Sequence, residues 1–246
     1  SKTEPNLDKW REFLSRLKNP KRTVEIGLIG KYVELKESYK SITESFIHAG
    51  AANEVEVKIR WIHSEHLTME NAAVTCKGLD GILVAPGFGE RGFEGKVSTV
   101  QYARENGVPY FGICYGMQAA VIEYARNVLG WSDANTTEVN AETSKPVIAL
   151  MDDQMHVTDK GGTMRLGAQN CVLEEGSKAS ESYGTTHISE RHRHRYEFNN
   201  QFKEELTAAG LKTTGINPET GLVEIVEVDN HPFFVGVQYH PEYKST

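Results

Sequence analysis

The stretch Tyr110-Phe111-Gly112-Ile113-Cys114-Tyr115-Gly116-Met117-Gln118 decides the fold that this sequence predicts. Residues 109–113 form a short apolar run typical of a buried strand, and residues 118–129 carry apolar side chains at helical spacing. Cys114 therefore falls where a strand turns into a helix. Gly112 and Gly116 flank it, and a nucleophile on a strained strand-to-helix turn needs such small neighbours. At a helix N-terminus the dipole and the free N–H groups favour thiolate over thiol, so the stretch predicts a cysteine nucleophile.

The segments around this stretch alternate between strand and helix patterns. Before it, strand patterns cover residues 23–29, 54–62 and 80–85, and helix patterns cover residues 37–51 and 96–105. This alternation predicts a parallel sheet with helices on both faces. After Gly130, further strand patterns follow at 146–151, 162–166, 191–198, 211–216, 222–228 and 233–239, with a helix at 201–209. We therefore expect an α/β fold: an open, mainly parallel central sheet flanked by helices, with a β-rich C-terminal half.

An amphipathic helix pattern precedes the first strand. Five apolar residues fall on one face of residues 6–17, namely Leu7, Trp10, Phe13, Leu14 and Leu17, and the Asn19-Pro20 pair ends the pattern. We expect residues 1–22 to form a leader or linker helix and residues 23–246 to form one domain.

Composition limits the classes of protein that fit. With 246 residues, 39% of them hydrophobic, the chain can build one large α/β core. A net charge of −7 argues against a nucleic-acid-binding surface. Cys76, Cys114 and Cys171 have no paired spacing, so we expect no disulfides, a cytoplasmic setting, and structural roles for Cys76 and Cys171. No apolar run of about 18 residues and no signal-peptide pattern occurs, so we expect a soluble protein without a membrane partner.

A cysteine nucleophile needs a base, and the base needs an acceptor that orients it. The segment 235–242, VGVQYHPE, supplies both at the end of a strand pattern. Ligands of open α/β sheets bind beyond the carboxyl ends of the strands, so Cys114 and His240 can converge there. Glu242 can then accept a hydrogen bond from the second ring nitrogen of His240. The sequence therefore predicts Cys114 as nucleophile, His240 as base and Glu242 as the orienting carboxylate.

Acyl transfer also needs N–H donors aimed at the developing oxyanion. The segment Ala85-Pro86-Gly87-Phe88-Gly89 follows the strand pattern at 80–85, and its glycines let a backbone N–H turn toward the same crevice. We place the oxyanion hole at the N–H groups of Gly87 and Tyr115.

These residues carry a resemblance to a known family. The segments GICYGMQ, VQYHPE and PGFG resemble class I (triad) glutamine amidotransferases. Five longer segments resemble the glutaminase domain of CTP synthases: GFGERGFEGK, ARNVLGWSDANTTE, GGTMRLG, ERHRHRYEFN and NHPFFVGVQYHPEY. The resemblance runs from about Val24 to the end of the chain. It implies hydrolysis of L-glutamine to glutamate and ammonia, and delivery of the ammonia to a synthase domain that aminates UTP with ATP.

The resemblance also implies which residues bind glutamine. It assigns the triad to Cys114, His240 and Glu242, the oxyanion glycine to Gly87, and glutamine contacts to Gly87, Tyr115, Gly116, Met117, Gln118, Glu138 and Arg195. Arg195 can pair with the substrate α-carboxylate, Glu138 with its α-ammonium group, and Gln118 offers an amide. The chain departs from the family pattern at Pro86, usually a glycine, and at Tyr115, often a leucine.

Further expectations concern groups outside this domain. The N-terminal synthase domain of the family, with its ATP, Mg²⁺ and UTP sites, is absent from this chain, so we read the chain as an excised domain that needs no cofactor. GTP is the family's allosteric activator, and the loop 88–96 resembles a lid, which makes Arg91 and Lys96 candidate effector contacts. The resemblance implies a full-length enzyme that is a homo-oligomer, a tetramer.

The run Arg191-His192-Arg193-His194-Arg195 offers an alternative, a metal site at the two histidines. Because side chains alternate along a strand, the arginines share one face and the histidines the other. We therefore expect packed histidines and an arginine row facing a substrate or partner, and no metal.

Three other functions stay open at this point. A glutaminase could serve a different synthase, such as the GMP or carbamoyl-phosphate enzymes, although GGTMRLG and ERHRHRYEF argue against this. A non-catalytic regulatory module could keep the fold and bind glutamine or a partner without turnover. A cysteine peptidase of similar fold would cleave peptides and leave free glutamine intact.

Overall fold

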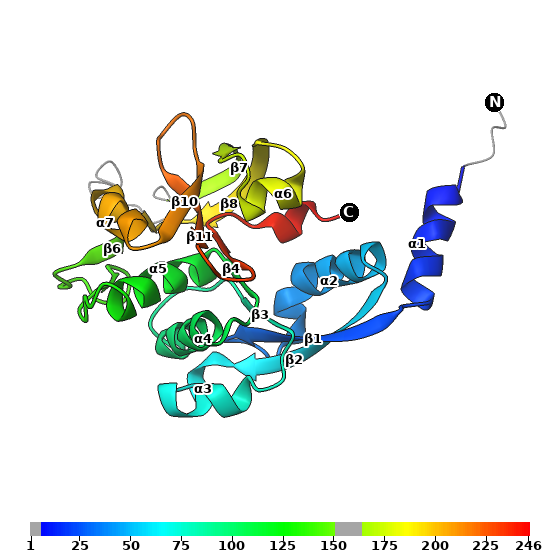
Figure 1. The fold of residues 1–246 in the computed structure, drawn as a ribbon, viewed down its shortest axis with the longest axis horizontal. Helices are drawn as coiled ribbons and strands as arrows, with labels where there is room; N and C mark the ends of the chain where they lie inside the picture. The colour runs from blue at the N-terminus through cyan, green and yellow to red at the C-terminus, as the bar shows by residue number, and fades with distance from the viewer. Residues whose placement is uncertain (1–5, 151–163) are drawn as a thin grey trace.

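The computed structural model describes residues 6–150 and 164–246, and a sheet of nine strands forms the centre of this part of the chain (Figure 1). The strands lie in the order β2-β1-β3-β4-β12-β11-β10-β7-β8. Their bounds are β1 Arg22–Gly30, β2 Val55–His63, β3 Gly81–Val84, β4 Tyr110–Ile113, β7 Arg165–Leu173, β8 His187–His194, β10 Leu211–Ile216, β11 Val223–Val228 and β12 Phe234–Val237. A smaller sheet joins β5 Asn135–Thr136, β6 Pro146–Ala149 and β9 Glu197–Phe198.

The central sheet has a parallel half and an antiparallel half. Pairing is parallel from β2 through β1, β3 and β4 to β12, and antiparallel from β12 through β11, β10 and β7 to β8. The predicted α/β class and the β-rich C-terminal half are confirmed, and the parallel arrangement is confined to the first half. The strands predicted at 146–151 and 162–166 extend partly outside the described residues.

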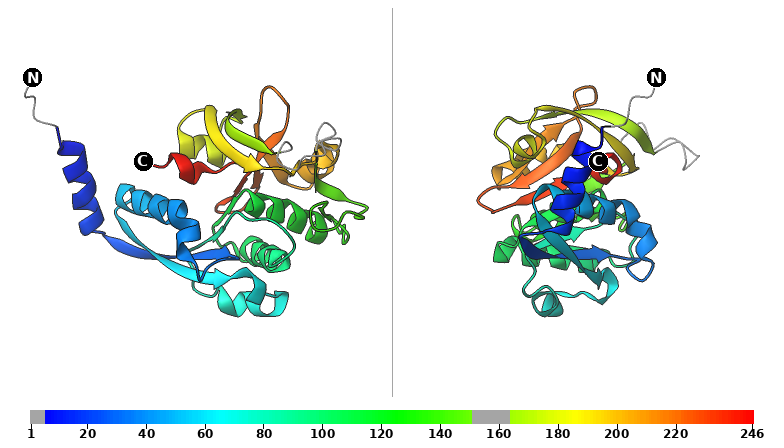
Figure 2. Two further views of the ribbon diagram at one scale, coloured as in Figure 1. Left: turned by 180° about the vertical axis from the view of Figure 1, so that it is seen from behind. Right: turned by 90° about the vertical axis from the view of Figure 1, so that its right-hand side faces the viewer.

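Helices cover both faces of the sheet (Figures 1 and 2). The longer ones are α1 Asp8–Lys18, α2 Lys40–Ala52, α4 Phe93–Asn106 and α5 Tyr115–Asn127, and the shorter ones are α3 Met69–Thr75, α6 Lys178–Tyr183 and α7 Lys203–Ala208. The described residues also form the 3-10 turns η1 Lys36–Tyr39, η2 Ser64–His66, η4 Asn200–Phe202 and η5 Pro241–Lys244. None of the helices in the described ranges has the length and apolar character that a membrane crossing requires.

Two apolar cores lie on opposite faces of the sheet. Neighbouring residues of one strand enter different cores: Ile29 and Val84 pack with α4 and α5, whereas Leu28 and Leu83 pack on the side of α2. This alternation is the two-residue period of a strand buried on both faces. The inner strands β3 and β4 are thus almost completely buried, whereas the edge strand β2 keeps Glu56 and Lys58 exposed.

The first helix stands at the edge of the domain, beside α2 (Figures 1 and 2). Helix α1 buries no residue, and Trp10 remains 58% exposed on it. Trp10 stacks on Phe13 with ring centroids 5.6 Å apart, and Phe13 meets the edge of the His48 ring on α2. A helix therefore forms where the amphipathic pattern predicts one, and part of its apolar face is open to solvent.

Candidate active site

Cys114 lies on a sharp turn between β4 and α5. Its φ of 52° and ψ of −100° are unusual for a residue with a side chain. The turn leaves no room for side chains at its neighbours, because a Cβ on Gly116 would lie 2.4 Å from the Val84 carbonyl oxygen and one on Gly112 would lie 2.7 Å from the Gly116 carbonyl carbon. The Cys114 amide donates to the Val237 carbonyl at 2.7 Å, which ties the turn to β12. The predicted strained turn is confirmed.

His240 reaches the same place because β12 lies next to β4, with Val237 paired to Ile113. The Nδ1 atom of His240 lies 2.8 Å from Oε1 of Glu242, and both side chains are buried. Burial lowers the pKa of His240, but the neighbouring Cys114 and Glu242 together raise it to about 10. His240 Nε2 has no hydrogen bond of regular geometry within the described chain, so this atom is left to exchange a proton with the sulfur or a substrate. The three predicted triad residues therefore come together.

The loop after β3 is held by side chains that bind its carbonyl groups. Lys96 Nζ donates to the carbonyl oxygens of Ala85 at 2.5 Å and Pro86 at 3.5 Å. Lys31 Nζ donates to the Phe88 carbonyl at 2.9 Å, and the Tyr115 hydroxyl donates to the Gly89 carbonyl at 2.7 Å. We call residues 85–89 the oxyanion loop. Its conformation is thus fixed before any ligand binds.

Gly87 sits against two of these supports. A Cβ at this position would lie 3.2 Å from Lys96 Nζ and 3.5 Å from Cδ1 of Tyr115. The backbone of Gly87 therefore rests on the ammonium group and the aromatic ring, at the end of β3, beside the strand that carries Cys114. This is the place that the sequence predicts for an oxyanion donor.

Lys96 does not lie on a surface lid, and the prediction that placed it there is wrong. Helix α4 begins at Phe93, just after Gly92 in the left-handed region, and this start turns the Lys96 side chain inward. Only 1% of Lys96 is exposed. Burial lowers its pKa to about 7, although the charge of Cys114 opposes the decrease. Arg91 is half exposed, pairs with Glu65 at 2.5 Å and lies over the Tyr32 ring.

The predicted glutamine contacts fall into two groups. Gly116, Met117 and Gln118 are buried in the first turn of α5, and the Met117 side chain packs beneath Gly236, so only the backbone of Met117 can face a ligand. Glu138 and Arg195 come from loops beside the smaller sheet. Glu138 Oε1 accepts from the Gly89 amide at 3.0 Å. Burial raises the pKa of Glu138, although this hydrogen bond and the charges of Arg195 and Lys31 oppose the increase.

Gln118 has only part of its amide left for a ligand. Its Nε2 atom donates to the Tyr196 carbonyl at 3.0 Å and to Gln238 Oε1 at 3.3 Å. Its Oε1 atom is buried and has no partner among the described residues. Gln118 can therefore accept a hydrogen bond from a substrate.

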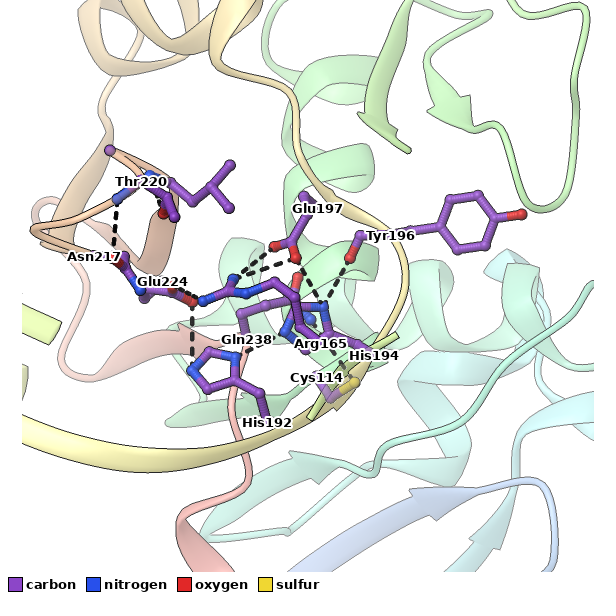
Figure 3. A network of polar contacts seen from close by, with 12 residues as sticks. Cys114, Arg165, His192, His194, Tyr196, Glu197, Asn217, Thr220, Glu224 and Gln238 are labelled. Atoms are coloured by element: carbon purple, nitrogen blue, oxygen red, sulfur yellow. Dashed lines mark hydrogen bonds and ion pairs between the residues drawn. The ribbon is translucent and has the colours of Figure 1, made fainter. Parts of the chain in front are cut away.

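Behind the nucleophile lies a buried ionic cluster (Figure 3). Arg165 pairs with Glu197 at 3.2 Å and with Glu224 at 2.8 Å, and the two carboxylate side chains are 2% and 0% exposed. His192 and His194 are also buried, whereas Arg191 and Arg193 are exposed, so the predicted alternation along β8 is confirmed. Within the described ranges, no group of three or more His, Cys, Asp or Glu side chains is arranged to hold a metal ion.

Cys76 and Cys171 differ from Cys114 in their surroundings. Both are buried and unpaired, and burial raises the pKa of Cys76 to about 11 and that of Cys171 to about 12. Their thiols stay protonated at neutral pH, in agreement with the structural roles expected for them.

Sequence reasoning missed four supports of this site: the Lys96 ammonium, the Tyr115 hydroxyl, the Gln238 amide and the Arg165 cluster. One signal was available for Gln238, because it lies two residues before His240 and an extended chain points such side chains to the same side. The other three depend on where distant elements pack.

Comparisons with known proteins agree with this geometry. Residues 34–246 match the family model for glutamine amidotransferase class-I. The CTP synthase of Flavobacterium johnsoniae is 62% identical over 245 residues, and that of Flavobacterium psychrophilum is 64% identical over 245 residues. Each match covers 100% of this chain and 46% of the relative, so the chain spans about half the length of these curated relatives.

Two solved structures are similar to this one in fold. The glutaminase domain of Trypanosoma brucei CTPS, with bound acivicin, is 40% identical, with a TM-score of 0.84 over 91% of this chain and 88% of that one. A putative GMP synthase protein from Thermoplasma acidophilum, 13% identical with a TM-score of 0.56 over 91% of this chain and 86% of that one, shares the fold alone. The chain therefore belongs to the class-I glutamine amidotransferase family, in the group formed by the glutaminase domains of CTP synthases.

Proposed function

We propose that this domain hydrolyses L-glutamine to L-glutamate and ammonia through a γ-glutamyl thioester on Cys114. The observation that carries the proposal is the convergence of three elements: Cys114 on a strained turn, the buried His240–Glu242 pair beside it, and the oxyanion loop next to both. A nucleophile, an oriented base and preorganised N–H donors are the three parts that acyl transfer requires.

The first half-reaction forms the thioester. The Cys114 thiolate attacks the side-chain carbonyl carbon of glutamine, and a C–S bond forms while negative charge moves to the oxygen. The N–H groups of Gly87 and Tyr115 stabilise that oxyanion. His240, which carries a proton because its pKa is raised to about 10, gives this proton to the departing nitrogen. The C–N bond breaks and ammonia leaves.

The second half-reaction uses the neutral imidazole that remains. His240 Nε2 takes a proton from water, and the resulting hydroxide attacks the thioester carbon. The C–S bond then breaks, which releases glutamate and restores the thiolate beside a protonated imidazole. Glu242 keeps the ring in one orientation through both steps, because it accepts from Nδ1 and leaves Nε2 facing the reaction.

Recognition of the amino-acid end falls to Arg195 and Glu138. A guanidinium group suits the α-carboxylate, and a carboxylate suits the α-ammonium group. One oxygen of Glu138 is already held by the Gly89 amide, so binding of the ammonium group at the other oxygen links substrate recognition to the oxyanion loop. Charged partners at both substrate ends favour free glutamine over a glutamine residue within a peptide.

For the whole enzyme, we infer from the similarity to CTP synthases that the ammonia passes to a synthase domain. There it aminates UTP to CTP with ATP and Mg²⁺, in a homo-oligomeric, cytoplasmic enzyme that GTP activates. Residues 1–22 then act as the leader between the two domains. The exposed apolar residues Leu7, Trp10 and Leu17 of the first helical region support a partner for that face. Arg91 remains the effector candidate on the exposed loop, and Lys96 does not, because it is buried.

A glutamine-like diazo-ketone tests the nucleophile and the pocket together. We expect one adduct per chain on Cys114 in the wild-type domain and none in Cys114→Ala, which also releases no glutamate. Cys171→Ala is the matched control, because this buried thiol lies away from the turn, and it should label like the wild type. Labelling with and without GTP, in the domain and in the full-length enzyme, measures the effect of the activator. Labelling that persists in folded Cys114→Ala, or glutamine binding without turnover, would refute the proposal.

A further inference from the structure

We propose that Gln238 makes a second polar contact to the Cys114 sulfur, in addition to that of His240: its amide N–H donates to the thiolate and stabilises it. This inference deepens the proposed glutaminase chemistry and rests on Cys114 being the nucleophile.

Gln238 touches the reacting atom directly. Its Nε2 atom lies 3.8 Å from Sγ of Cys114, within the range of an N–H···S hydrogen bond (Figure 3). The side chain is completely buried, and its backbone amide donates to the Glu224 carbonyl at 2.8 Å. The contact therefore belongs to a fixed part of the protein and is shielded from water.

The orientation of the Gln238 amide follows from the chemistry of its neighbours. The Tyr196 carbonyl can only accept hydrogen bonds, so the Gln118 atom 3.0 Å away must be its NH₂ group. The same NH₂ group lies 3.3 Å from Gln238, so the atom of Gln238 that faces it must be the oxygen. The NH₂ group of Gln238 is thereby directed at the sulfur.

A second branch ends on the same carbonyl. His194 Nδ1 lies 3.2 Å from the Tyr196 oxygen and must donate to it, which leaves His194 Nε2 as an acceptor. His192 Nδ1, 2.7 Å from that atom, then donates. Burial lowers the pKa of His192 to about 3 and that of His194 well below its usual range, so each ring carries one proton. The Tyr196 carbonyl thus receives donors from two sides and cannot turn away.

The Gln238 contact acts at a different moment from His240. His240 gives its proton to the leaving nitrogen, is neutral while the thioester stands, and carries a proton again only after it has taken one from water. Gln238 has no proton to lose and remains a donor when the C–S bond breaks and the thiolate reappears. A donor to sulfur that persists through the cycle favours the thiolate both as attacking group and as leaving group.

Alkylation of Cys114 by iodoacetamide across pH 5 to 10 tests this contact without using glutamine. The variants are Gln238→Met, which removes the donor at similar length, and Gln238→Glu, which places a carboxylate against the sulfur. Charged groups that interact with Cys114 include His240, which is paired with Glu242, and Lys96, and neither variant replaces any of the three. Cys76 and Cys171 serve as internal references, because their raised pKa values keep them unreactive over most of this range.

We expect the midpoint of the Cys114 pH profile to rise by about 0.5 to 1 pH unit in Gln238→Met, the size of one long hydrogen bond to a charged group. In Gln238→Glu it should rise further, because a carboxylate repels the thiolate. Gln201→Met, an exposed glutamine-to-methionine change, should leave the midpoint unchanged. Thermal unfolding of each variant establishes that the fold is retained.

Each outcome decides one proposal. A wild-type Cys114 that iodoacetamide and the diazo-ketone both leave unmodified would overturn the proposed function. A reactive wild-type Cys114 with equal midpoints in wild type, Gln238→Met and Gln238→Glu would overturn only the role of Gln238, and equal shifts in both variants would reduce that role to packing. If neither variant folds, Gln118→Met provides the same test. It removes the NH₂ group that orients the Gln238 amide, so this amide can flip. The midpoint of the Cys114 pH profile should then rise, by less than in Gln238→Met.

Discussion

Replacing Lys96 with methionine separates what a buried ammonium group costs in stability from what it contributes to catalysis. Lys96 lies beneath the oxyanion loop and is 1% exposed. Burial lowers its pKa from the usual 10.5 to about 7. Between these two pH values the unfolded chain binds more protons than the folded protein, so the free energy of unfolding of the wild type rises with pH.

The magnitude follows from the same two pKa values. At pH 7 the buried lysine lowers the free energy of unfolding by about 4 kcal/mol relative to a side chain that does not titrate, and at pH 10 by only about 1 kcal/mol. Lys96→Met removes this cost, but it also removes the hydrogen bond to the buried Ala85 carbonyl, a loss of about 1–3 kcal/mol. The variant should therefore be more stable than wild type by about 1–3 kcal/mol at pH 7, and this advantage should fall by about 3 kcal/mol by pH 10.

Urea unfolding of wild type and Lys96→Met at pH 7 and pH 10 measures the difference between their free energies of unfolding. Ionisable groups that titrate identically in both proteins do not contribute to this difference. Lys77→Met, a change at an exposed lysine, is the control and should alter the free energy of unfolding little at either pH. In a glutaminase assay, kcat of Lys96→Met should fall by about 10- to 100-fold, because the Gly87 N–H loses its support while the donor itself remains. A stability difference that is independent of pH would refute the reasoning about the buried charge, and an unchanged kcat would refute the supporting role.

Two further substitutions test other supports of the site. Tyr115→Phe removes the 2.7 Å hydrogen bond to the Gly89 carbonyl but keeps the backbone N–H, so steady-state assays should show kcat/KM lowered by about 3- to 10-fold; wild-type kinetics would show that the hydroxyl is dispensable. Arg165→Met leaves Glu197 and Glu224 buried without their cation, so denaturant unfolding at pH 7 should show a loss of about 3–5 kcal/mol. That loss should shrink at pH 5, since burial already raises the pKa of Glu224 and favours its neutral form; a loss that is equal at both pH values would contradict this explanation.

The parts of the fold that a local pattern encodes could be predicted from the sequence. Alternating apolar runs identified β1 to β4, and the Gly112 and Gly116 spacing identified the turn at Cys114, because both are consequences of short-range geometry. Helix α6 was missed because KASESY has no apolar period, and it is held instead by the Ser177 cap and by the Glu227 carboxylate, which accepts from its first amides.

In the candidate site too, the residues that a local pattern encodes were predicted and those that depend on tertiary packing were not. Nucleophile, base and orienting carboxylate were found because their chemistry restricts them to few residue types at strand ends. Lys96 was placed on a surface lid because the loop 88–96 resembles the lid of the family, whereas the direction of its side chain depends on the helix start after Gly92. The Arg165 cluster depends on strands β7, β9 and β11 meeting, which no local pattern encodes.

The position of β12 also has a consequence for how the protein is made. This strand inserts between β4 and β11 and comes after every other strand of the described residues, yet the partners of Cys114, which is synthesised long before it, follow directly after it. A nascent chain that has left the ribosome as far as β11 holds Cys114 without His240, Glu242 or the Val237 carbonyl that fixes the turn. We expect such an intermediate to be silent toward glutamine, with ammonia production beginning only when β12 and the residues that follow it are in place.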